Sequence, residues 1–322
     1  MSRPERLWRG CRLGKSGGDD VKSLRNRLLR RIFLLVALAF MACAMVQQWE
    51  AISRVGWTFR SDLLTVAIGG VVLVFLLDAY GWHLTLVALG QRIRVADSIR
   101  IWLVSSLARY VPGGIWAYAG RIHLAKEAGI GAAPAALSLT LETLLLIGSS
   151  FAAGFPSLLA GAELPLPPYV AVVAWIAFGF LLHPRALSQL RRLPGRLGSA
   201  FHQIALPQPR QMLFLYLYYL VFWLAFGLLF DCFVAAFYPL PPQAWLPVGS
   251  SLAMGFFVGF VAVVVPAGIG VRESVMYLLL LPYLPPPASM FISVSSRLWI
   301  MAGEFLCLAL VMIESRIKRG RG

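Results

Sequence analysis

Between Leu63 and Gly90 the chain reads LLTVAIGGVVLVFLLDAYGWHLTLVALG, an apolar run in which Asp78 is the only acidic residue and no Lys or Arg occurs. A helix needs about 20 mostly apolar residues to cross the hydrocarbon core of a bilayer, so this run predicts a membrane-spanning helix. Similar runs predict further spans at residues 32–49, 133–161, 169–183, 211–238, 244–265 and 287–313. The sequence therefore predicts an all-α, polytopic membrane helix bundle.

The composition supports the same class. Of the 322 residues, 59% are hydrophobic and 13% are charged, and the mean hydropathy is +0.75. Soluble domains are about 45–50% apolar and about 25% charged. These values exclude a soluble enzyme, a disordered chain and a disulfide scaffold. The net charge of +15 does not indicate nucleic-acid binding, because the basic residues flank the apolar runs and so indicate membrane topology.

Positive charge outside the spans predicts how the chain is oriented. Four segments are rich in Lys and Arg: residues 1–31, 91–100, 184–210 and 315–322. Basic loops are retained in the cytoplasm. We therefore expect a protein of the bacterial inner membrane with both termini cytoplasmic. We expect residues 32–314 to form one integral-membrane domain, a candidate for an internal repeat, between two basic tails, 1–31 and 315–322.

Two apolar pieces do not fit simple spans. Two cytoplasmic termini require an even number of crossings, so the preferred topology has eight, with residues 274–284 as a short crossing. The alternative has seven crossings and a re-entrant 274–284. Residues 99–119 contain Arg109 and a Pro-Gly-Gly sequence, and they predict a re-entrant or interfacial segment. Such irregular backbone survives at membrane depth only inside protein or beside water.

An internal similarity links these two regions. Val111-Pro-Gly-Gly-Ile-Trp116 resembles Val265-Pro-Ala-Gly-Ile-Gly270, and each is followed by an arginine and then by an ionisable residue in the next apolar helix. Paired Pro/Gly-interrupted segments of this kind are typical of transporter repeats and of midplane binding sites. The alternative is chance recurrence in a chain rich in Pro and Gly. The predicted topology places both breaks near the cytoplasmic side, which does not suit a simple inverted repeat.

Ionisable residues within or beside the spans are the candidate functional residues. Each costs about 2.5–3.5 kcal/mol at the centre of a helix, so such residues usually face a cavity or a partner. Arg109, Arg272 and Arg297 could bind a phosphate headgroup bidentately. The alternative is buried Arg–Glu pairs that fix helix packing. The predicted binding or translocation residues are Arg109, Tyr110, Pro112, Gly113, Gly114, Arg121, Glu142, Pro266, Gly268, Gly270, Arg272, Glu273, Arg297 and Glu304.

The sequence contains no recognisable catalytic or metal-binding pattern. The four His and four Cys residues lack metal-ligand spacing. We therefore predict no metal, no cofactor and no enzymatic activity. A membrane-embedded enzyme with Glu142 or Glu273 as a general base is a minor alternative.

The stretch from Arg109 to Gly114 with Arg121 downstream, together with Pro266-Ala-Gly-Ile-Gly-Val-Arg-Glu273, resembles the membrane region of bacterial lysylphosphatidylglycerol synthases and their stand-alone relatives. The resemblance covers about residues 32–313, and Ala267 replaces a glycine expected in many relatives. It implies a lipid-translocating membrane domain. Aminoacyl transfer in the full-length synthases belongs to a separate soluble domain that uses charged transfer RNA, and we expect none here, because the chain ends shortly after its last span.

These observations favour a flippase-like protein that handles an anionic phospholipid or a lipid-linked glycan, with membrane lipids as its partners. The alternative is a non-catalytic membrane partner of a separate glycosyl- or aminoacyl-transferase. No nucleic-acid partner is expected.

Overall fold

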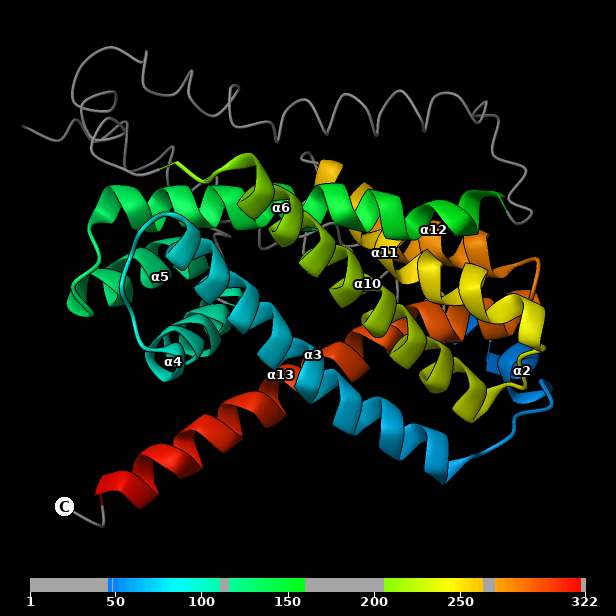
Figure 1. Ribbon diagram of the computed structural model, residues 1–322. Coiled ribbons are helices and arrows are strands. Elements are labelled where there is room, and N and C mark those ends of the chain that lie inside the picture. The colour runs from blue at the N-terminus through cyan, green and yellow to red at the C-terminus, as the bar shows by residue number, and fades with distance from the viewer. Residues whose placement is uncertain (1–45, 48, 111–115, 160–205, 263–269, 320–322) are drawn as a thin grey trace, which may run out of the picture.

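The computed structural model describes residues 46–47, 49–110, 116–159, 206–262 and 270–319. This part of the chain is helical, with short connections (Figure 1). The elements are α2 (Trp49–Ser53), α3 (Ser61–Ala88), α4 (Val95–Ser106), η1 (Leu107–Tyr110), α5 (Trp116–Glu127), α6 (Ala132–Leu159), α10 (Pro209–Phe237), η3 (Pro242–Ala244), α11 (Trp245–Val261), α12 (Val271–Leu280) and α13 (Pro286–Arg319).

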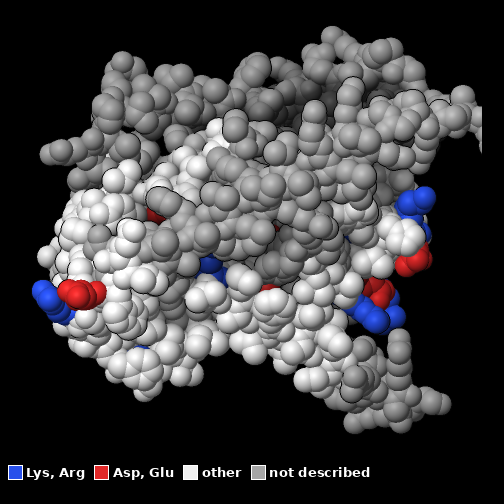
Figure 2. Space-filling model, turned by 180° about the vertical axis from the view of Figure 1, so that it is seen from behind, with Lys and Arg blue, Asp and Glu red and all other residues white. Residues whose placement is uncertain are grey.

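Within the described residues, five helical segments are long and apolar enough to cross a membrane: Ser61–Ala88, Ala132–Leu159, Pro209–Phe237, Pro242–Val261 and Pro286–Ile313. They correspond to five of the predicted spans and confirm the all-α polytopic class. The predicted span at 169–183 lies outside the described residues, as does nearly all of 32–49. Figure 2 shows one face on which most described side chains are uncharged and the Lys, Arg, Asp and Glu side chains lie mainly toward its two ends.

Glycines set the distances between the long helices. α3 and α10 run antiparallel, because Gly70 lies against Leu229 whereas Gly81 lies against Tyr219. On α6, a Cβ at Gly154 would lie 2.6 Å from the backbone nitrogen of Met254 in α11. Small residues are expected at such contacts, because lipid supplies no hydrophobic drive for association and close packing must replace it.

Gly154→Ala should therefore lower stability by about 1–3 kcal/mol, because the new methyl group meets backbone atoms that cannot rotate away. Gly69→Ala is the matched control, since nothing lies within 4 Å of a Cβ at that position in α3. Thermal unfolding in detergent would compare the two variants. Equal melting temperatures would contradict the close packing of α6 on α11.

Two helical hairpins flank the long helices. α4, η1 and α5 leave the end of α3 and lead back to the start of α6, whereas α11 and α12 leave the end of α10 and lead back to the start of α13. Since α3 and α10 are antiparallel, the hairpins open at opposite ends of the bundle (Figure 1). The prediction that both breaks lie near the cytoplasmic side falls on residues 111–115 and 263–269, which lie outside the described residues.

α12 is too short to cross by itself. Its ten residues measure about 15 Å, half of the roughly 30 Å hydrocarbon core. This length favours the re-entrant alternative for residues 274–284 over the preferred short crossing. Antiparallel packing of α12 on α11 places Gly259 against Arg272 and Gly255 against Met276. The start of α12 thus lies inside the bundle.

Candidate functional site

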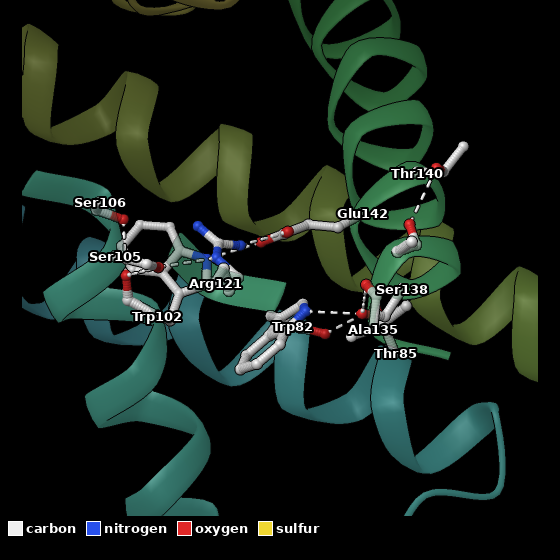
Figure 3. A network of polar contacts seen from close by, with 12 residues as sticks. Trp82, Thr85, Trp102, Ser105, Ser106, Arg121, Ala135, Ser138, Thr140 and Glu142 are labelled. Atoms are coloured by element: carbon white, nitrogen blue, oxygen red, sulfur yellow. Dashed lines mark hydrogen bonds and ion pairs between the residues drawn. The ribbon is translucent and has the colours of Figure 1, made fainter. Parts of the chain in front are cut away.

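The first hairpin is fixed to α6 by a buried ion pair (Figure 3). Arg121 of α5 donates from Nη1 to Glu142 Oε2 at 2.6 Å, and only 8% and 5% of the two side chains are exposed. Trp102 of α4 donates from Nε1 to Glu142 Oε1 at 2.7 Å, and Arg121 Nε donates to Ser105 Oγ at 3.1 Å. The Arg121 guanidinium carbon also lies 5.0 Å from the Trp102 ring centroid and 5.4 Å from that of Trp82.

This arrangement holds the first hairpin, α4–α5, against α6. Both carboxylate oxygens of Glu142 and two nitrogens of Arg121 are engaged, and aromatic rings lie near the guanidinium. The two charges compensate each other, so the pair has no net charge to offer a ligand. For these two residues the geometry fits the packing alternative, in which a buried pair holds α4 and α5 against α6.

The second hairpin is arranged differently at the start of α12. Gly270 has φ of 87°, a left-handed conformation that favours glycine. Its N–H donates to Glu273 Oε2 at 2.7 Å. The other oxygen, Glu273 Oε1, accepts from Nε of Arg297 in α13 in a short ion pair. Glu273 therefore holds the first turn of α12 against α13.

Arg272 lies beside this pair without a partner of its own. Its Nε is buried and makes no hydrogen bond, and within the described residues its side chain joins no ion pair within 4 Å. Both Arg297 and Glu273 lie near enough to act on it electrostatically. The cluster of Arg272, Arg297 and Glu273 therefore has one positive charge that no described carboxylate compensates. The positive end of the α12 dipole adds to it, so the local field favours an anion.

α13 links the two hairpins. Arg297 faces α12, while Glu304, seven residues later, lines a small cavity with Trp102, Leu103 and Ser106 of α4. The predicted residues therefore form two groups: Arg121 with Glu142, and Gly270 with Arg272, Glu273 and Arg297. The side chains of Arg109 and Tyr110, and residues Pro112, Gly113, Gly114, Pro266 and Gly268, lie outside the described part.

Sequence reasoning missed three features. Asp231 is buried in α10 with 3% exposure, although it is the only acidic or basic residue between Gln211 and Tyr238. The rule that selected Asp78 would have selected it as well. Trp102 and Ser105 are partners of the Arg121–Glu142 pair, and no sequence spacing signals those contacts.

Among the described residues, no three His, Cys, Asp or Glu side chains are grouped to hold a metal ion. The chain matches no curated protein. Residues 28–302 match the family model described as the lysylphosphatidylglycerol synthase TM region, and no other domain is matched. The match spans most of the chain and includes both hairpins and the ion pairs described above. The chain is thus a multi-pass membrane protein that belongs to the lysylphosphatidylglycerol synthase TM-region family.

Proposed function

We propose that this protein transfers a lipid with an anionic head, either an anionic phospholipid or a lipid-linked glycan, across the bilayer. The observation that carries the proposal is Arg272 at the start of a half-span helix, a cation whose Nε is buried and which has no hydrogen-bond or ion-pair partner among the described residues. An unpaired charge within a membrane-spanning bundle costs free energy, and ionisable residues at such positions usually serve function. A phosphate would accept hydrogen bonds from the planar guanidinium and offset its charge.

The arrangement of the hairpins supports translocation rather than static binding. Transporters place their sites where interrupted helices from two repeats meet near the midplane, and half-helix N-termini point at anionic groups there. Here α4–α5 and α11–α12 enter from opposite ends, and α13 contacts both. A headgroup at Arg272 would therefore lie between the two ends of the bundle.

A reconstitution experiment tests the proposal. Vesicles with and without the protein would carry fluorescent phosphatidylglycerol, phosphatidylcholine or a polyprenyl phosphate, and an impermeant reductant would report transfer between leaflets. We expect the protein to accelerate exchange of an anionic lipid. No acceleration for any lipid, together with stoichiometric copurification of a soluble transferase, would replace the proposal with a partner-protein role.

We also propose an inner-membrane location with the α4–α5 end in the cytoplasm, because Arg92, Arg94 and Arg100 lie there. In a cysteine-free background, Gln243→Cys before α11 should react with an impermeant maleimide on intact bacterial cells. Glu127→Cys at the end of α5 should react only after permeabilisation. Both residues are exposed. The reverse pattern would invert the orientation.

A further inference from the structure

Asp231 in α10 is a buried carboxyl that the proposed headgroup site at Arg272 does not use. Only 3% of the residue is exposed, and its Oδ1 atom makes no hydrogen bond. Oδ2 lies against Gly249 of α11, where a Cβ would be only 2.5 Å away. A Cβ on Gly249 would also lie 2.9 Å from the carbonyl oxygen of Gly227. The two glycines therefore make room for the carboxyl between α10 and α11.

No described charge compensates Asp231. The thiol of Cys232 follows it on α10, but no charged or titratable side chain of the helices packed against α10 acts on it electrostatically. Among the described side chains these are Asp62, Asp78, Tyr80 and His83 on α3, Glu142 on α6, and Arg297, Glu304 and Cys307 on α13, whereas α11 has none. Burying an uncompensated carboxylate costs free energy, so a buried carboxyl without a partner takes up a proton.

A cavity of about 250 Å³ between α6, α10 and α11 gives access to this carboxyl, and Asp231 and Ser250 are among its lining residues. The 29 residues of α10 measure about 44 Å, which exceeds the roughly 30 Å hydrocarbon core by about 7 Å at each end. Asp231 precedes the last residue, Phe237, by about 9 Å along the helix. The carboxyl therefore lies near the boundary between hydrocarbon and headgroups, where water supplies protons.

α11 connects this carboxyl to the headgroup site. Near its start Gly249 meets Asp231, and near its end a Cβ on Gly259 would lie 3.1 Å from the Cβ of Arg272. The two glycines are ten residues, about 15 Å, apart on the same helix. A neutral carboxyl packs against Gly249, whereas a carboxylate needs water around it and loosens that contact. A shift of α11 at Gly249 therefore also moves the backbone that lies against Arg272.

We propose that Asp231 is a proton-binding site that couples lipid transfer to a transmembrane proton gradient. The proton comes from water at the Phe237 end of α10, and an O–H bond forms on the carboxyl. Release of that proton toward the other side, after α11 has shifted, breaks the same bond. Only a proton moves, so the step needs no oxidant or reductant. This inference rests on the proposed lipid transfer and adds its energy source.

The test imposes a pH difference of one unit on vesicles that contain the full-length protein and fluorescent phosphatidylglycerol, with protein-free vesicles as the baseline. We expect wild type to drive the lipid toward one leaflet, up to about tenfold if one proton accompanies each lipid. Asp231→Asn should lose this asymmetry. Asp62→Asn, which changes an exposed carboxylate near the same end of the bundle, should retain it. An asymmetry that survives in Asp231→Asn would overturn the proposal.

The wild-type result separates this proposal from the proposed function. Exchange of phosphatidylglycerol without any response to the pH difference would overturn the coupling alone. No exchange of any lipid would contradict the proposed function and the coupling with it.

A chemical measurement needs no variant and decides the matter if Asp231→Asn is inactive. Dicyclohexylcarbodiimide is an apolar reagent that adds to protonated carboxyl groups. The half-exposed side chains of Leu224, Leu228 and Leu246 line the cavity, so the reagent can enter it from the bilayer. We expect peptide mass spectrometry to find the adduct on Asp231 of wild type, with less adduct at higher pH, and the labelled protein to lose the asymmetry. Absence of the adduct at every pH would overturn the proposal.

Discussion

Arg272→Gln is expected to slow transfer of an anionic lipid by about 10- to 100-fold while leaving the melting temperature near that of wild type. Hydrogen bonds to charged groups contribute about 1.5–3 kcal/mol, and each 1.4 kcal/mol is tenfold. Folding should survive because the Arg272 side chain has no hydrogen-bonding partner in the described structure. Among the described residues, its removal leaves no hydrogen-bonding group without a partner. The leaflet-exchange assay measures the rate, and thermal unfolding in detergent measures stability.

Substitutions of two other arginines serve as comparisons for Arg272→Gln. Arg54→Gln changes an exposed arginine paired with Glu50 and should affect neither rate nor stability. Arg297→Gln breaks the pair with Glu273 and should reduce both, because it leaves a buried carboxylate uncompensated. If Arg272→Gln transports lipid at the wild-type rate, or if it unfolds as Arg297→Gln does, Arg272 is a packing residue.

Glu142→Gln is expected to cause the largest loss of stability, about 3–5 kcal/mol, because it leaves the Arg121 charge buried without a counter-charge. The corresponding fall in melting temperature is roughly 6–20 °C. Trp102 would also lose a charged acceptor for its indole N–H. Thermal unfolding in detergent checks the change.

Glu127→Gln is the control for that experiment, since Glu127 is exposed and, among the described residues, pairs with His123 on the helix surface. Its effect should stay within about 0.5 kcal/mol. Combining Arg121→Met with Glu142→Leu should recover much of the loss, because replacing a buried pair by apolar groups is often nearly neutral. A Glu142→Gln variant as stable as wild type would show that the Arg121–Glu142 pair contributes little to stability.

The fold was largely predictable from hydropathy, because apolar runs such as 63–90 and 211–238 have the length of a bilayer crossing. The arrangement of the second hairpin, α11–α12, could not be predicted from hydropathy. Loop charge carries no information on how a ten-residue helix such as α12 packs, and its contact with α11, where Gly259 lies against Arg272, is seen only in the structure.

Sequence reasoning selected charged residues that lie together at the two hairpins, but it did not predict which of them pair. Buried charges at two breaks were identifiable by their cost in lipid, yet pairing Glu142 with Arg121 rather than with another arginine depends on how α5 folds against α6. The same limit applies to Trp102, a residue whose indole N–H finds a carboxylate only in three dimensions.

α13 is one continuous helix from Pro286 to Arg319, and it contacts α12 through Arg297 and α4 through the turn that carries Glu304. A rigid helix that contacts both hairpins, α4–α5 and α11–α12, transmits a tilt from one hairpin to the other. A tilt that separates its first turns from α12 presses its later turns toward α4, and the reverse tilt does the opposite. We therefore expect opening at one end of the bundle to be coupled through α13 to closure at the other.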